Sequence, residues 1–134
     1  MKKAIAGISV LVLLLAADFQ AWAYAAQQGM VKVAVASTGK TTTASVSNLA
    51  AHSPYYLIFD DTGKLIEVIS NPHKDTARNA GPSAANFLAA KGVTIVIAEK
   101  FGIKMINTMK ANRIGHFEFK GHVDEAVSKV LDLK

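Results

Sequence analysis

The chain has 134 residues, of which 15 are basic and 10 acidic, so its formal net charge at pH 7 is +5. This length allows one compact domain with its own hydrophobic core and leaves too few residues for a second. The absence of cysteine excludes disulfides, thiolate-bound zinc, cysteine-held iron–sulfur clusters and a cysteine nucleophile. Any bound metal is therefore expected to be held by histidine, carboxylate or backbone groups, or by electrostatic attraction alone.

The first 25 residues have the three parts of a secretory signal peptide. A basic start at residues 2–3 is followed by an apolar run over 4–17 and by the small-residue segment AYA at 23–25, whose spacing signal peptidase cleaves. A membrane-spanning helix needs roughly 20 apolar residues, more than this run supplies before Asp18 ends it. We therefore expect residues 1–25 to be removed and the protein to be periplasmic or secreted.

The expected mature chain, residues 26–134, is a single basic domain. It keeps 13 basic and 9 acidic residues, a formal net charge of +4. Its lysines are spread along the chain, without the basic stretch and interleaved aromatic residues typical of nucleic-acid binding. We expect an inorganic anion or a metal species as ligand, with a protein acceptor as a further partner, no nucleic acid, and contact with a membrane only through an uncleaved leader.

Five segments have the hydrophobic pattern of β-strands. VKVAVA alternates with period two, YYLIFD and LIEVIS flank the turn sequence DTGK, VTIVIA is a continuous β-branched run, and IGHFEF precedes a breaking glycine. The second and third segments are expected to form a hairpin, and the fourth is expected to lie inside the sheet. The five strands are predicted at residues 31–36, 55–60, 65–70, 93–98 and 114–119.

Three further segments have the pattern of short helices. Pro82 is suited to the first position of one helix. The next helix is expected to have Ile103, Ile106 and either Met109 or Lys110 on one face and to end at Asn112 in a left-handed conformation. The last helix has apolar residues at the i, i+3, i+4 and i+7 spacing of an amphipathic helix. The three helices are predicted at residues 82–91, 103–112 and 123–131.

This order of elements predicts an α/β protein, with three layers (α/β/α) around a five-stranded mixed sheet. Ligands of such sheets bind at the carboxyl ends of the strands. At that edge the chain has three connections, at 37–54, 71–81 and 99–102. The first is rich in Ser, Thr, Gly and Asn, which predicts a long loop that is too polar for a core element.

Two patterns imitate catalytic sites but lack residues that the chemistry needs. Gly39, Lys40 and Thr41 follow a strand as in a phosphate-binding loop, but Ala34 stands at the position of the first glycine and no apolar helical face follows. The carboxylates show no convergence on a metal pair, and there is no nucleophile elbow. We therefore expect a binding protein and not an enzyme.

Histidines and basic residues near the predicted binding edge are the candidate site. His52 and His73 are either surface residues or contacts of a metal or anion, whereas His116 and His122 are expected in a strand and at a helix start. Basic side chains and helix-start amides beside the same loops predict an anion cradle, although scattered solvated lysines would give the same sequence. The cradle comprises Lys74, Arg78, Lys100 and Lys104, with the amides of Gly81 and Gly102.

Taken in order, the segments VKVAVASTG, VSNLAAHSPYYLIFDD, NP, AGPSAANFLAAKGVTIVIAEKFGIK and VDEAVSKVL resemble the dinitrogenase iron-molybdenum cofactor biosynthesis domain family over roughly residues 31–132. The resemblance implies a ribonuclease H-like fold and a non-enzymatic carrier of a metal–sulfur cluster containing iron, molybdenum or copper. On this hypothesis His52 and His73 are metal ligands or hydrogen-bond donors. Charge and backbone amides would come from Lys74, Arg78, Gly81, Lys100 and Gly102.

The chain departs from the family pattern in the first loop. Leu49 stands where the family has histidine, and Ala50 and Ala51 replace a Phe-Gly pair, while His52 occupies the basic position that follows. The leader is a second departure, because nitrogenase cofactor assembly requires a reducing cytoplasm. Two hypotheses follow: an exported carrier of a metal–sulfur species, or an exported interaction module that keeps the fold and has lost metal binding.

Overall fold

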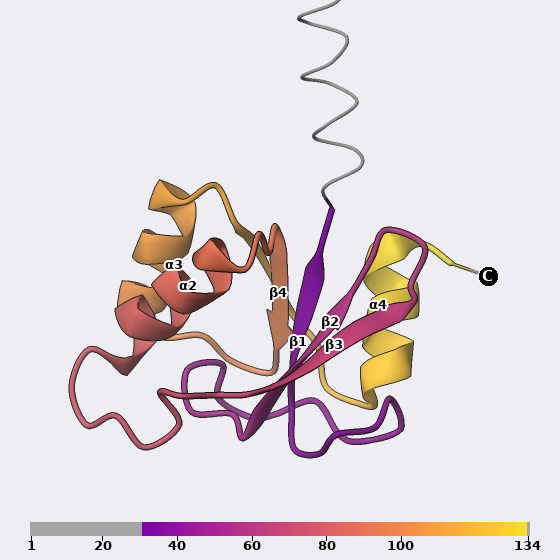
Figure 1. Cartoon of the computed structure of the whole chain (residues 1–134), viewed down its shortest axis with the longest axis horizontal. Helices are drawn as coiled ribbons and strands as arrows, with labels where there is room; N and C mark the ends of the chain where they lie inside the picture. Colours follow the sequence, from indigo (N-terminus) through magenta and orange to yellow (C-terminus); the bar gives the residue numbers. More distant parts are fainter. Residues whose placement is uncertain (1–30, 134) are drawn as a thin grey trace, which may run out of the picture.

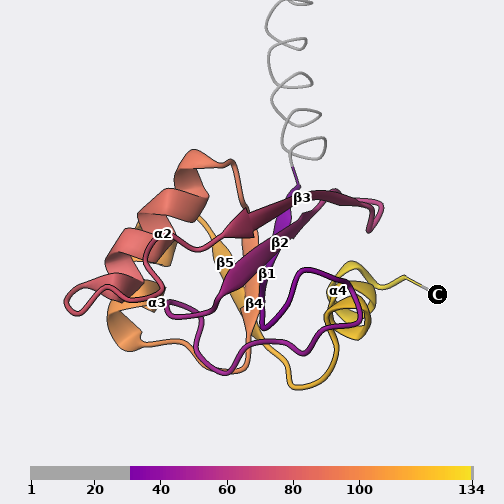
Figure 2. The same ribbon diagram turned by 60° about the horizontal axis from the view of Figure 1, so that its bottom comes forward.

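The computed structural model describes residues 31–133, which form a five-stranded mixed sheet between two helical layers (Figures 1 and 2). The expected leader lies outside these residues. No helix within the described part of the chain is long and apolar enough to cross a membrane. In chain order the elements are β1 (Val33–Ser37), β2 (Tyr55–Phe59), β3 (Leu65–Ser70), α2 (Ala80–Ala90), β4 (Ile95–Ala98), α3 (Ile103–Ala111), β5 (Gly115–Glu118) and α4 (Val123–Leu131).

The strands are arranged in the order β3-β2-β1-β4-β5. β1 is antiparallel to β2 and parallel to β4, and the β2–β3 hairpin and the parallel β4–β5 pair complete the sheet. The three-layer α/β architecture and the mixed sheet predicted from the sequence are therefore confirmed. The predicted hairpin is also present, and Gly63 in its turn has a φ of 86°, which glycine adopts without strain.

Alternating residues of β1 supply the two halves of the core. Val33 and Val35 pack in the cluster on the side of α4, whereas Ala34 and Ala36 belong to the cluster beneath α2 and α3. This follows from the period-two geometry of a strand, which sends successive side chains to opposite faces. Figures 1 and 2 show α2 and α3 together on one side of the sheet and α4 on the other.

Helix α2 begins two residues before the predicted position. Asn79 precedes it with a φ of 57°, a left-handed conformation that asparagine tolerates better than most residues. Pro82 is consequently the third residue of the helix. The first four N–H groups of a helix have no intrahelical acceptor, so the missing N–H of proline costs no hydrogen bond there.

The buried face of α3 shares only Met109 with the apolar face that the sequence predicts. Met105 and Met109 are fully buried, while Ile103 is 67% exposed. The packing of α3 against α2 decides this rotation, because Gly81 of α2 lies directly against Met105: a β-carbon built on Gly81 would stand 2.9 Å from the Met105 β-carbon. The missing side chain of Gly81 thus allows the two helix starts to approach closely.

The end of α3 also differs from the prediction. Asn112 has a φ of −98°, and the left-handed residue is Arg113, with a φ of 58°. The Asn112 side-chain amide donates to the Thr108 carbonyl at 2.9 Å. Asn112 therefore ends the helix by capping a carbonyl group with its side chain, and the reversal of the chain occurs one residue later.

The segment 37–54 is more ordered than its polar composition predicts. It makes isolated bridges to β1, to His122 and to Lys100, and it contributes two fully buried residues, Val46 and Ala50, to the core. The segment is a long loop without a regular element of its own, as predicted, but its apolar residues Val46 and Ala50 reach the core. Single apolar residues between polar ones show no periodicity, so the sequence gives no signal for their burial.

The contact between the two helix starts leads to a matched pair of predictions. Gly81→Ser should lower the free energy of unfolding by about 1–3 kcal/mol, because the added atoms collide with Met105. Gly102→Ser should be neutral or stabilising by up to about 1 kcal/mol, because serine is a favoured N-cap and no atom lies within 4 Å of the added β-carbon. Urea unfolding of both variants measures this, and equal midpoints would contradict the proposed close approach.

Candidate functional site

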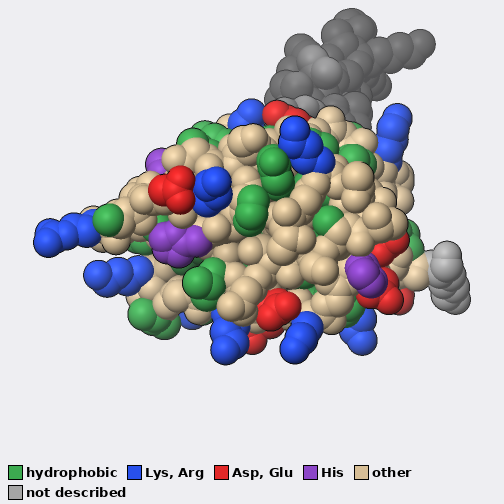
Figure 3. All heavy atoms as spheres, turned by 90° about the horizontal axis from the view of Figure 1, so that it is seen from below, with side chains coloured by type: hydrophobic (Ala, Val, Ile, Leu, Met, Phe, Trp, Pro, Cys, Tyr) green, Lys and Arg blue, Asp and Glu red, His purple; other side chains and the backbone are tan. Residues whose placement is uncertain are grey.

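Three of the chain's connections meet at one edge of the sheet. β1, β3 and β4 end there and the antiparallel β2 begins there, so the loop 38–54, the loop 71–79 and the turn 99–102 lie together at the lower end of the molecule in Figure 1. Figure 3 shows this edge from below, with basic side chains around its rim and histidines on its surface. The sequence correctly predicted which loops share this edge.

The segment 47–50 runs alongside the chain that leaves β4. The Glu99 N–H donates to the Ser47 carbonyl and the Lys100 N–H to the Asn48 carbonyl, both at 3.0 Å, and the Ala50 N–H donates back to the Lys100 carbonyl at 3.1 Å. These bonds form a short parallel ladder beyond the named strands. The ladder fixes the backbone of both loops before any ligand is present.

Tyr56 of β2 holds the segment 47–50 through a buried hydrogen bond. Its side chain is fully buried, and its hydroxyl donates to the Ala50 carbonyl at 2.6 Å. Burial raises the pKa of the Tyr56 hydroxyl well above its usual value of 10.0, because the low-dielectric interior disfavours the phenolate. The hydroxyl therefore stays protonated and remains a donor over the whole physiological range of pH.

Asn71 joins the loop 38–54 to the loop 71–79. Its amide nitrogen donates to the carbonyls of Ala51 and Ser53, at 2.8 and 2.9 Å, and its amide oxygen accepts from the His73 N–H at 2.9 Å. The Asn71 side chain is buried, so water cannot replace these bonds at low cost. The Asn71 amide thus joins the two loops, together with the bond from the Asn71 backbone N–H to the Pro54 carbonyl at 3.0 Å.

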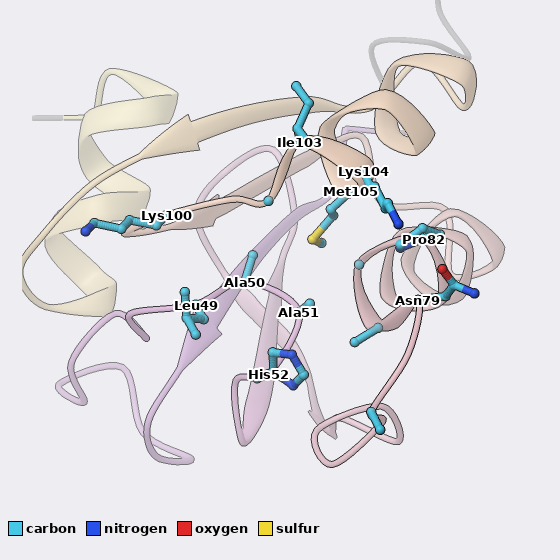
Figure 4. A pocket seen from close by; sticks show the side chains of 14 residues that line it. Leu49, Ala50, Ala51, His52, Asn79, Pro82, Lys100, Ile103, Lys104 and Met105 are labelled. Atoms are coloured by element: carbon cyan, nitrogen blue, oxygen red, sulfur yellow. The ribbon is translucent and has the colours of Figure 1, made fainter.

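A cavity of about 400 Å³ opens between these loops and the starts of α2 and α3. Figure 4 shows the Met105 side chain directed toward Ala50, Lys104 beside Pro82, His52 across the cavity from Met105, and Lys100 extending away. The residues that line the cavity are Leu49, Ala50, Ala51, His52, Ala77, Asn79, Ala80, Gly81, Pro82, Lys100, Gly102, Ile103, Lys104 and Met105.

Two helix starts face this cavity and give it a positive potential. At the start of α2 the Ser83 N–H donates to the carbonyl of the N-cap residue Asn79 at 3.0 Å. At the start of α3 the Ile106 N–H donates to the carbonyl of the N-cap residue Gly102, also at 3.0 Å. The amides before these donors have no acceptor within the helix. Lys100 and Lys104 add full charges, and none of the described residues that line the cavity is acidic. The site is therefore suited to an anion.

The orientation of His52 leaves one ring nitrogen available to a ligand. Its Nδ1 lies 2.9 Å from the Lys74 carbonyl oxygen, which can only accept a hydrogen bond, so Nδ1 carries a proton. In the neutral ring Nε2 then holds the lone pair and can bind a metal or accept a proton. Lys74 thus contributes to the site through its backbone.

The structure brings five of the predicted site residues to one cavity, namely His52, Gly81, Lys100, Gly102 and Lys104. His73, Lys74 and Arg78 are not among the lining residues. The His73 ring packs edge-on against Phe87, with 6.1 Å between the ring centres. Within residues 31–133 no three His, Asp or Glu side chains come together as a metal site.

Sequence reasoning missed Met105 and Asn79 as lining residues. Met105 escaped notice because the rotation of α3 depends on the glycine of another helix, and Asn79 because its left-handed conformation is invisible in the sequence. His116 and His122 lie in β5 and at the start of α4, as predicted. Lys40 of the apparent phosphate loop lies over the Tyr55 ring, 5.6 Å from its centre, and does not line the cavity.

Comparison with known proteins places this arrangement in a family. The model of the family described as dinitrogenase iron-molybdenum cofactor matches residues 31–133, which includes every element of the sheet and every lining residue. The chain belongs to this dinitrogenase iron-molybdenum cofactor family. No match was found among curated proteins.

Solved structures share the fold of this family member. The apo form of the orange protein from Desulfovibrio gigas is 23% identical, with a TM-score of 0.72 over 75% of this chain and 87% of that one. A Thermotoga protein provisionally assigned as NifB is 31% identical, with a TM-score of 0.66 over 76% and 88%. A protein from Methanocaldococcus jannaschii, provisionally assigned as a dinitrogenase, is 19% identical, with a TM-score of 0.52 over 75% and 88%.

The role of Asn71 can be tested by a nearly isosteric change. Asn71→Asp keeps an acceptor for the His73 N–H but replaces the donor to Ala51 and Ser53 by a carboxylate oxygen. We expect a loss of about 2–4 kcal/mol in the free energy of unfolding at pH 7, because two buried carbonyls then face a negative charge. Protonation of the carboxyl should recover part of this loss near pH 4. A stability equal to that of the wild type at pH 7, measured by urea unfolding, would contradict this role.

Proposed function

We propose that this protein is a non-enzymatic carrier of an anionic metal–sulfur cluster or a related metal species, with iron, molybdenum or copper as the metal. The observation that carries the proposal is the cavity at the sheet edge, which combines two helix starts, two lysines and the free Nε2 of His52 with no acidic lining residue. Sulfido clusters are anions, and such a cavity attracts them without supplying a complete set of metal ligands.

Family membership supports this choice of cargo. The matching family model is named for the iron-molybdenum cofactor of dinitrogenase, and the Thermotoga relative is provisionally assigned as NifB. The rim of the cavity is exposed at Lys100, Gly102 and Lys104. A cargo held there remains accessible to an acceptor protein, as a carrier requires.

Within this proposal His52 is the residue that contacts the cargo most directly, because it is the only histidine of the described cavity lining and its Nε2 is not used by the bond to Lys74. A neutral imidazole can bind a metal atom at the surface of a cluster, and a protonated one can donate to a sulfide. Lys104 and Lys100 balance the negative charge. His73 would reach the cargo only if its ring left the contact with Phe87.

A second function is favoured by one specific observation. Leu49, Ala50 and Ala51 line the cavity at the positions where the family resemblance implies cluster contacts. A domain that kept the fold and lost metal binding would serve as an interaction module, with Leu49, 47% exposed, as an apolar contact for a partner protein. Failure of the purified protein to bind any metal–sulfur anion would favour this alternative.

We also propose that the carrier works outside the cytoplasm, on the basis of the signal-peptide pattern in residues 1–25. Cleavage after Ala25 should give a periplasmic or secreted protein of 109 residues that begins at Ala26. Intact-mass measurement on protein from fractionated native cells tests this. A cytoplasmic protein that retains Lys2 and Lys3 would overturn the proposed export.

Binding of cargo can be tested with tetrathiomolybdate, a small molybdenum–sulfur anion with strong absorption. Anaerobic titration of the wild-type protein should give saturable binding. Lys104→Gln and His52→Ala should each weaken it about three- to tenfold, because each removes a charge or a donor from the cavity. Raising the salt concentration should weaken binding further, since the contacts are partly exposed.

Two variants serve as matched controls for this titration. Lys110→Gln removes the same charge from the last turn of α3, and His73→Ala removes an imidazole from outside the lining. Both should bind tetrathiomolybdate within about twofold of the wild type. Equal losses in Lys104→Gln and Lys110→Gln would indicate general charge attraction and not a site, and would contradict the proposed function.

A further inference from the structure

The lining of the cavity is largely apolar, and a small inorganic anion would not contact most of this apolar surface. Eight of its fourteen lining residues are apolar. The cavity volume of about 400 Å³ lies in the range of pockets that hold organic molecules, whereas one water occupies only about 30 Å³ of liquid. A small oxyanion or thioanion at the helix starts would therefore leave much of this volume unfilled and the exposed Leu49 side chain facing water.

The apolar wall is preformed because its members belong to rigid parts of the fold. Ala50 and Met105 are 1% exposed and pack in the core beneath α2 and α3. Ala50 is held by the Tyr56 hydroxyl, and Met105 is held by its contact with Gly81. The buried side chains of Ala50 and Met105 therefore close the floor of the cavity, and its accessible apolar surface comes from lining residues such as Leu49 and Ala51.

The polar groups are confined to the borders of this wall. Lys104 lies beside Pro82, and His52 lies across the cavity from Met105 (Figure 4). The described lining residues supply no carboxylate, so an acid group of a ligand meets only donors and positive charge. A ligand with an apolar body and one anionic end matches this distribution, because the body contacts apolar side chains and the anionic end contacts donors and positive charge.

We propose that the cavity binds an organic anion, whose apolar body of one or two aromatic rings packs against Leu49 and Ala51, above a floor closed by the buried Ala50 and Met105, and whose acid group lies at the starts of α2 and α3 beside Lys104. The inference shares one assumption with the proposed function, that a negatively charged group lies at the starts of α2 and α3, and it rests on the proposed function in this respect only. It names a different class of ligand, an aryl sulfonate or carboxylate, and requires no metal.

Three small ligands separate the two parts of the proposal. Naphthalene-2-sulfonate has both the body and the charge, naphthalene-2-sulfonamide has the same body without the charge, and methanesulfonate has the charge without the body. Calorimetric titration of the full chain should show that naphthalene-2-sulfonate binds at least about tenfold more tightly than either other ligand. The sulfonamide lacks the charge interaction, and methanesulfonate lacks the apolar contact.

Variants of the cavity then locate the binding. Ala51→Leu, which fills the space above the wall, and Lys104→Gln, which removes the charge beside it, should each weaken naphthalene-2-sulfonate about three- to tenfold. Leu49→Gln tests the apolar rim at an exposed position, where folding is not at risk, and should have an effect in the same direction. Lys110→Gln is the matched control and should bind like the wild type. Thermal unfolding of each variant verifies that the fold is intact.

Several outcomes would overturn the inference. Equal binding of methanesulfonate would mean that the wall is unused, and equal binding of the sulfonamide would mean that charge is not selected. Loss of binding in the Lys110→Gln control, or unchanged binding in Ala51→Leu and Lys104→Gln, would place the ligand elsewhere. Tetrathiomolybdate separates this inference from the proposed function: binding of that anion without naphthalene-2-sulfonate refutes the inference alone, and the converse refutes the metal–sulfur cargo alone.

Discussion

The side-chain amide of Asn71 is the constraint on which the candidate site depends. The two loops that form one wall of the cavity share no strand, and a buried loop carbonyl without a partner costs free energy. Asn71 satisfies two carbonyls of one loop and an N–H of the other. This arrangement allows a long polar segment to be held beside the sheet without regular secondary structure of its own.

The opposite wall depends on close packing instead of hydrogen bonds. Gly81 lets the first turn of α2 approach the backbone of α3 at Met105, and this contact brings the two helix starts to the same cavity. Helix starts carry unpaired N–H groups wherever they lie, but only their convergence produces a concentrated positive potential. A single β-carbon at position 81 would push apart the two groups that the anion needs together.

The cavity thus combines an apolar interior with a cationic border. Inorganic clusters and organic anions bind to such a site through different interactions. Clusters need positive charge and hydrogen-bond donors, and organic anions also need an apolar surface from which water is excluded. The proposed carriage of a metal–sulfur species relies on Lys104, His52 and the helix starts, whereas the proposed binding of an organic anion relies in addition on Leu49 and Ala51. The two ligand classes share the anion position and differ in their use of the wall.

Much of the fold could be predicted because its signals are local. Alternation in VKVAVA, the turn DTGK and the β-branched run VTIVIA specify strands by side-chain period and turn chemistry, and the right-handed crossover rule then limits their arrangement. The binding edge and the residues His52, Gly81, Lys100 and Gly102 followed from which loops lie at the carboxyl ends of strands. These inferences needed no knowledge of how the layers pack.

The remaining features depend on contacts between distant segments. The rotation of α3 that buries Met105 and exposes Ile103 is set by Gly81 on another helix, and the burial of Val46 and Ala50 is set by bonds to residues 121, 100 and 56. The position of His73 beside Phe87, outside the cavity, is likewise a result of packing. The sequence alone determined the elements, their order and the sheet edge that carries the candidate site, because period, turn chemistry and chain direction are local properties. Only the tertiary structure decided which side chains face the cavity, because that depends on close approaches between segments far apart in the chain.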